Sequence, residues 1–140
     1  MNEPDHLAEA RRWLRFAAED LGFAETAFKE EGNPPRHICW LAQQAAEKAL
    51  KGALVFLQTD FTKTHDLDAI KNLLPKGWRA RQDCLGLADL TEWAVEARYP
   101  GDWPEATRDD ARAALKQARG VLEAVMDDLG RNGFVLDAGD

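Results

Sequence analysis

Several charged and amide side chains stand on, or directly beside, the apolar faces that residue spacing predicts for the helices of this chain. They are Asp20, Gln44, Glu47, Lys48, Lys51 and Arg98. An unpaired buried charge is costly, so each side chain must find a partner or line a cleft. Two interpretations are open. One is an internal salt-bridge network, the commoner case, and the other is a polar groove that receives a phosphate or a partner's side chain.

Two further positions belong with this polar stripe. His65 stands in the run TKTHDL just before a predicted helix start, where a histidine caps or docks the loop or joins the groove. Tyr99 precedes Pro100, which forces it into an extended conformation. This corner would fix Arg98 and Tyr99 at the mouth of a bundle. In a groove, the cations would face phosphate oxygens, and Tyr99 or Trp103 would stack on a base.

The sequence has none of the common motifs for cofactor or metal chemistry. It contains no phosphate-binding glycine loop, no HExxH and no GxSxG. The three histidines are scattered without helical pairing, and Cys39 and Cys84 form no CxxC. We therefore expect no metal site, no cofactor and no catalytic residue of a known motif. With only two cysteines, a reduced cytoplasmic location is the simplest expectation.

Length and charge narrow the class of protein further. The chain has 140 residues, enough for one domain with a real core. Its 18 basic residues stand against 25 acidic ones, a net charge of -7. Strong binding along DNA or RNA needs a basic face and is not expected. No apolar stretch approaches the length of a membrane span, and the polar N-terminus has no signal-peptide core, so we expect no membrane association.

The elements that must position the polar stripe are helices almost throughout. Apolar residues at three- and four-residue spacing predict helices over 5–30, 34–58, 79–97 and 107–130, with a short one starting at Thr64 or Asp66. Asn33 is the expected cap of the second helix, and Thr107 with Asp110 has the spacing of a capping box. We predict an all-α, antiparallel up-and-down four-helix bundle with one extra short helix, over 1–130, and a tail over 131–140.

Five segments of this sequence resemble one known family. They are AEDLGFAETAF (18–28), LAQQAAEKALKGAL (41–54), KTHDL (63–67), EARYPGDW (96–103) and EATRDDARAALKQARGVLEAV (105–125). In this order they resemble the HEPN domain, the higher eukaryotes and prokaryotes nucleotide-binding domain, over about residues 7–129. The combination is specific, although each segment alone is weak.

The resemblance implies a compact helical bundle that is commonly a homodimer. Many such proteins are encoded beside a minimal nucleotidyltransferase and act with it as a two-component, toxin–antitoxin-like module. It also implies nucleotide binding, which we assign to ATP or GTP. The residues expected to contact the nucleotide are Lys48, Lys51, His65, Arg98 and Tyr99. Asp20, Gln44 and Glu47 are expected to support the groove.

The sequence departs from the catalytic branches of that family at one point. Those ribonucleases use an arginine, four to six intervening residues and then a histidine. Here Arg98 is followed at these distances by Trp103, Pro104 and Glu105. We therefore expect a non-enzymatic partner protein. The alternatives are a metal-independent RNase toxin that uses Arg98 with His65, and a structural adaptor without a ligand.

A homodimer is also expected from the apolar surface of a small bundle. The helix over 34–58 carries an alanine-rich face, which would let a neighbouring helix approach closely. Together with five tryptophans, this face leaves apolar surface that a small bundle does not fully cover. The sequence does not indicate which helices pair.

Overall fold

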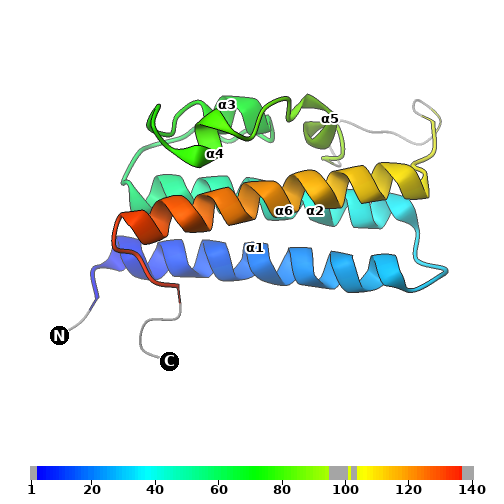
Figure 1. Ribbon diagram of the computed structural model, residues 1–140, viewed down its shortest axis with the longest axis horizontal. Coiled ribbons are helices and arrows are strands. Elements are labelled where there is room, and N and C mark those ends of the chain that lie inside the picture. Colours follow the sequence, from blue (N-terminus) through cyan, green and yellow to red (C-terminus); the bar gives the residue numbers. More distant parts are fainter. Residues whose placement is uncertain (1–2, 95–100, 102–103, 137–140) are drawn as a thin grey trace.

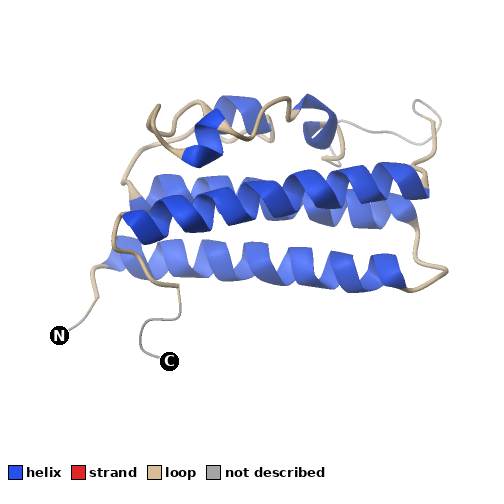
Figure 2. Cartoon of the chain, in the orientation of Figure 1, coloured by secondary structure: helices blue, strands red, loops and turns tan. Residues whose placement is uncertain are grey.

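Three long helices carry the fold: α1 (Asp5–Lys29), α2 (Pro35–Phe56) and α6 (Arg108–Arg131). The computed structural model describes residues 3–94, 101 and 104–136. Three short helices, α3 (Leu67–Lys71), α4 (Arg79–Gln82) and α5 (Ala88–Thr91), follow α2. In Figure 1, α2 and α6 lie side by side, with α1 on one side of them and α3–α5 on the other. Figure 2 shows only helices and loops over the described residues.

The apolar stripes of the sequence explain why α1, α2 and α6 pack together. The buried residues of α1 are Ala10, Leu14, Ala17, Leu21 and Ala24, at three- and four-residue spacing. On α6, the Thr107 side chain accepts from the Asp110 amide and the Asp110 side chain accepts from the Thr107 amide. This reciprocal capping box confirms the predicted helix start. The predicted all-α antiparallel bundle is likewise confirmed, with α3–α5 in place of a fourth long helix.

The small residues of α2 bring α1 unusually close. A Cβ added to Gly52 would lie 3.0 Å from the Trp13 Cβ and 3.2 Å from the Leu14 Cγ. Ala42, Ala45, Ala49 and Ala53 are fully buried. The predicted close approach of a neighbouring helix is therefore confirmed. The alanine-rich face was also expected to remain as surface for a dimer, and that is wrong, because the chain covers this face itself.

Two local predictions are wrong. The helix expected over 79–97 is instead two short helices, α4 and α5, separated by a loop in which Gly86 has φ +67°. That left-handed conformation favours glycine and ends a continuous helix. Asn33 does not cap α2: its side-chain amide donates to the Ala27 carbonyl at the end of α1. The cap position belongs to Pro34, with Pro35 in the first turn of α2.

Polar side chains hold the layer of short helices together and join it to α6. The buried Asp128 on α6 accepts from the Arg79 and Ala80 amides at 2.8 and 2.9 Å. The buried Lys71 donates to the Cys84 carbonyl at 2.9 Å. Asp66 accepts from the Ala69 amide and caps α3, as predicted. This layer is thus held by side chains that bind backbone groups and by buried apolar residues of the core, among them Leu67, Ile70 and Leu90.

The chain beyond α6 returns to the core. Phe134 is almost fully buried and packs edge to face on Phe56, with the ring centroids 5.3 Å apart. The Arg11 guanidinium donates to the Leu136 carbonyl at 2.9 Å. Among the described residues, no helix is long and apolar enough to cross a membrane.

Candidate functional site

The Glu47 carboxylate is the centre of a polar cluster on α2. One of its oxygens accepts from the Gln43 amide at 3.0 Å and lies 2.7 Å from His65 Nδ1. The other accepts from Lys51 Nζ at 2.9 Å. Gln43, Glu47 and Lys51 share one helix face because they stand four residues apart. His65 enters from the loop before α3, and its carbonyl also accepts from Gln43 at 3.4 Å. We call these four residues the Glu47 cluster.

Most of the Glu47 cluster is buried. Gln43 is 0% exposed, Glu47 7% and Lys51 8%, whereas the His65 side chain is 39% exposed. Burial raises the pKa of the Glu47 carboxyl, but hydrogen bonds from Gln43, His65 and Lys51 outweigh it. The net pKa of Glu47 is therefore below its ordinary value. Glu47 is an ionised carboxylate at neutral pH, and it neutralises the buried Lys51.

A second ion pair joins α1 to α2 beside this cluster. Lys48 Nζ lies 2.5 Å from an Asp20 carboxylate oxygen, and both side chains are about three-quarters buried. Gln44 donates to the Gln43 side-chain carbonyl at 2.8 Å and so reaches the cluster indirectly. The internal pairing expected from the sequence is thus confirmed for Lys48 and Lys51.

The structure brings together some of the predicted site residues but not all. Glu47, Lys51 and His65 are in direct contact, and Gln44 reaches them through Gln43. Lys48 is paired with Asp20. Arg98 and Tyr99, as well as Trp103, lie outside the described residues, and their roles stay predictions.

Sequence reasoning missed Gln43, the most buried member of the cluster. Its four-residue spacing to Glu47 was the available signal, because that spacing allows a side-chain hydrogen bond along a helix. The contact with His65, which lies 22 residues further along the chain, is set by the tertiary fold.

The pairing of Glu47 with His65 fixes the histidine ring. If Nδ1 carries the proton that faces the carboxylate, Nε2 is left as the acceptor of the neutral ring. A histidine held in this way can take up or release a proton, or donate to an anion when protonated. Among the described residues, no group of three or more His, Cys, Asp or Glu side chains is placed to hold a metal ion.

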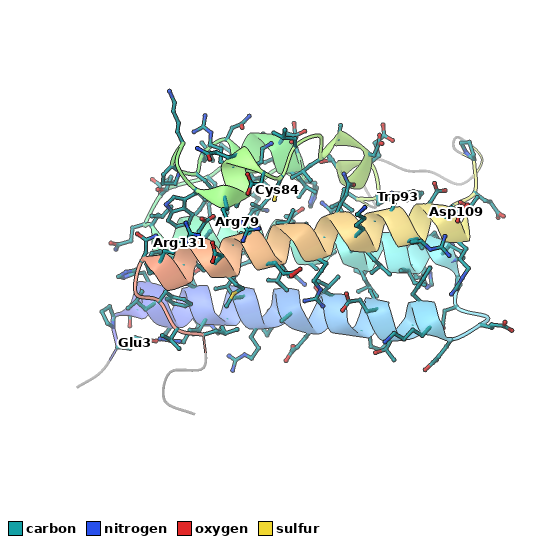
Figure 3. All side chains as sticks on the ribbon, viewed as in Figure 1. Glu3, Arg79, Cys84, Trp93, Asp109 and Arg131 are labelled. Atoms are coloured by element: carbon teal, nitrogen blue, oxygen red, sulfur yellow. The ribbon has the colours of Figure 1, made fainter. Side chains whose placement is uncertain are left out.

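A cleft lies elsewhere, between the segment 83–93 and α6. It has a volume of about 780 Å³ and includes Cys84 and Trp93, both labelled in Figure 3. Among the described residues, its lining holds the carboxyl groups of Asp83, Asp89, Glu92, Glu105 and Asp110 and a single lysine, Lys116. Burial raises the pKa of the Cys84 thiol. These described carboxylates repel phosphates, so among the described residues the Glu47 cluster is the better candidate for an anionic ligand.

Comparison with known proteins agrees with this fold. The family model described as "HEPN domain" matches residues 10–129. The chain belongs to the HEPN domain family. A Methanocaldococcus jannaschii protein named "Putative toxin MJ1304" is 26% identical over 137 residues, which cover 87% of this chain and 89% of that protein. The predicted resemblance is confirmed.

Two solved structures are similar to this chain in sequence and in fold. TT1696 from Thermus thermophilus is 29% identical and superposes with a TM-score of 0.71, covering 85% of this chain and 97% of that one. ST0689, titled an archaeal HEPN homologue, is 28% identical with a TM-score of 0.64, covering 84% and 95%. The similarity therefore extends over nearly the whole of both solved chains and most of this one.

Proposed function

We propose that this protein is the HEPN component of a two-component, toxin–antitoxin-like module and that it acts as a homodimer. Its protein partner is a small nucleotidyltransferase. The observation that carries the proposal is the match to a protein named as a toxin, which extends over 87% of this chain and 89% of that one. A likeness of that extent involves the whole domain rather than one motif.

The partnership is tested by co-expression with the small nucleotidyltransferase encoded beside this chain. Native mass spectrometry of the purified pair should show a complex of both proteins. If the gene has no such neighbour, or the two proteins separate during purification, the two-component proposal is wrong.

The Glu47 cluster is the place proposed for a nucleotide phosphate. His65 is partly exposed, and an imidazole N–H can donate to a phosphate oxygen. Lys48 and Lys51 already have carboxylate partners, Asp20 and Glu47. A phosphate must compete with these carboxylates, so we expect weak binding. Arg98 and Tyr99 remain the residues proposed to hold the phosphate and the base.

Calorimetric titration with ATP and GTP tests this site. Binding to the wild type should be lost in His65→Ala and in Arg98→Ala. The matched control is Lys76→Met, which removes an exposed lysine from a loop of the outer layer. If the wild type binds neither nucleotide, the cluster is a structural ion-pair network and the protein is an adaptor.

The contact between Glu47 and His65 favours one alternative function, a metal-independent ribonuclease. Neutral His65 would take the proton of an RNA 2′-hydroxyl as its oxygen attacks the adjacent phosphorus. The 5′-oxygen would leave and take up a proton from the protonated His65 or from water, giving a 5′-hydroxyl and a 2′,3′-cyclic phosphate. Arg98 would stabilise the charge on the phosphate.

An RNA digestion in the presence of EDTA tests this alternative. The wild type should cleave, whereas His65→Ala, which removes no buried charge, should not. Cleavage that persists in His65→Ala, or its absence from the wild type with several RNAs, rejects the ribonuclease.

A further inference from the structure

The cleft between the segment 83–93 and α6 has the length of a short helix. α6 contributes residues from Asp110 to Gly120, which is about 15 Å of helix rise, or nearly three turns. Ala113, Ala114 and Gly120 lie on this α6 side, and their small size lets another chain approach closely. The volume of about 780 Å³ is therefore open along a strip of α6 that a partner segment can follow.

The facing wall of the cleft supplies larger apolar side chains. Leu87 is buried, and Trp93, labelled in Figure 3, is partly buried. Leu85 is 72% exposed. A leucine this exposed at the edge of an apolar cleft adds little to the core of this chain, and it gives a partner an apolar contact.

Two contacts hold the walls of the cleft together. Gln117 on α6 donates to the Gly86 carbonyl at 3.2 Å, and the Cys84 thiol donates to the Gly120 carbonyl at 3.8 Å. Both pairs belong to the lining or border it. The cleft is thus formed before anything binds, which lowers the cost of ordering it around a partner.

The charges of the lining select what binds. Among the described residues, the lining has five carboxylates and one lysine. Asp83 is paired with Arg79 at 3.3 Å, which leaves four carboxylates against Lys116. Asp89 and Glu105 are exposed, and neither forms an ion pair within the described residues. An apolar cleft with this charge favours a cationic segment and disfavours an acidic one.

The charges beside the cleft do not cancel this excess. On α6, Arg112 is paired with Asp109. In the sequence, residues 95–103 contain one arginine, Arg98, against Glu96 and Asp102. These residues therefore bring no net positive charge.

We infer that this cleft, called the acidic cleft below, binds a helical segment of a partner protein that carries lysine or arginine beside a short apolar stripe. The described residues form helices and loops without a strand, so a partner segment cannot bind by extending a sheet edge. A helix satisfies its own backbone groups and needs only side-chain contacts. Its apolar stripe contacts Leu85 and Trp93, and its cations lie near Asp89 and Glu105. The acidic cleft is separate from the Glu47 cluster, and the inference holds whichever protein is the partner.

A model peptide tests the acidic cleft. The probe is a fluorescein-labelled helix of leucine and lysine, about four turns long, with its leucines at three- and four-residue spacing. Fluorescence anisotropy with the full chain, at about 0.15 M salt, should show saturable binding of one peptide per chain at micromolar concentration.

Two matched variants test the charges. Asp89→Asn/Glu105→Gln should weaken binding about threefold to tenfold, because two exposed ion pairs are lost. Glu19→Gln/Glu30→Gln removes two exposed carboxylates on and at the end of α1. It should change the affinity by less than about twofold, because distant exposed charges are screened at this salt concentration.

A second matched pair tests the apolar contact. Leu85→Ser should weaken binding roughly fivefold, because the leucine loses its burial against the peptide. Leu73→Ser changes a 46% exposed leucine outside the lining and should bind like the wild type. Circular dichroism confirms that each variant is folded.

Two further peptides test the chemistry of the partner. A peptide with glutamate in place of lysine should not bind. A peptide of the same leucine and lysine composition, with the leucines spread around the helix, should bind more weakly by roughly fivefold, because its apolar side chains cannot all face the cleft.

The acidic cleft is not a docking surface if the wild type shows no saturable binding, or if its variants bind like their matched controls. Equal binding of the two lysine peptides also overturns the inference. So does weakening in the carboxylate variant with Leu85→Ser unchanged, because the cleft would then attract cations without recognising an apolar stripe. None of these results affects the nucleotide titration or the co-expression test.

Discussion

Replacing Glu47 by glutamine should destabilise the protein strongly. The substitution keeps the shape of the side chain but removes its charge. The Lys51 side chain is only 10% exposed, and its ammonium lies 2.9 Å from Glu47. Breaking a buried pair by removing one partner leaves an uncompensated charge, which costs about 3 kcal/mol or more. We expect the lower end of that range, because a glutamine oxygen still accepts one hydrogen bond.

That loss corresponds to a clear thermal shift. Unfolding entropy is about 2.1 cal/mol/K per residue, or roughly 0.3 kcal/mol/K for a chain of this length. A loss of about 3 kcal/mol therefore lowers Tm by about 10 °C. Urea unfolding at neutral pH, followed by circular dichroism, measures the free energy directly.

A double-mutant cycle separates the charge from other effects. Lys51→Met removes the cation and keeps most of its length. Glu47→Gln combined with Lys51→Met has no buried charge left in the pair, so it should be more stable than Glu47→Gln alone by about 2 kcal/mol. If the double variant is no more stable than the single one, or Glu47→Gln is within about 0.5 kcal/mol of the wild type, Lys51 does not depend on Glu47.

Four other predictions follow from the same structure. The pKa of Glu47 is lowered in the folded protein, so the stabilisation from its carboxylate is full above the unfolded pKa and is lost as pH falls through the folded pKa. The Tm should therefore fall more steeply below about pH 4.5 in the wild type than in Glu47→Gln. Gly52→Ala should destabilise by about 1–2 kcal/mol in urea unfolding, because its Cβ meets α1, whereas Gly22→Ala, with open space around it, should stabilise by about 0.5–1 kcal/mol. Asp128→Ala should cost about 2–3 kcal/mol and speed amide hydrogen exchange in α4, since two backbone amides lose their acceptor; unchanged exchange there would contradict this role. Cys84 should react with iodoacetamide more slowly in the folded than in the unfolded protein at about pH 8, as followed by mass spectrometry, because burial raises its pKa.

The long helices were predictable because their signals are local. The stripe of α1 repeats every three or four residues, and Thr107 needs only Asp110 to form the cap of α6. The pairing of Glu47 with Lys51 was equally predictable from the sequence, since both residues lie on one helix face. These features depend on neighbours within one or two turns, and a pattern in the sequence records such neighbours directly.

The region after α3 was not predictable in the same way. Cys84, Leu87 and Thr91 keep helical spacing, yet the chain turns at Gly86. The turn is stabilised by distant groups: Lys71 donates to the Cys84 carbonyl, and Gln117 donates to the Gly86 carbonyl. Short helices held by long-range contacts leave little periodicity in the sequence. For the same reason, the alanine face of α2 did not reveal that α1 and α6 would cover it.

The position of the short helices α3–α5 on one side of the long helices has a consequence for local opening of the native state. A peripheral layer of short helices can open as one cooperative unit at a lower free energy than global unfolding, even though apolar residues such as Leu67 and Leu90 are buried beneath it. His65 lies in the loop that leads into α3, and its ring contacts Glu47 on the long helix α2. Detachment that moves this loop breaks the contact between His65 and Glu47. A ligand that binds both residues therefore stabilises the closed layer by its own binding free energy. A partner protein that binds the detached layer lowers the affinity for that ligand, and the ligand lowers the affinity for the partner by the same factor.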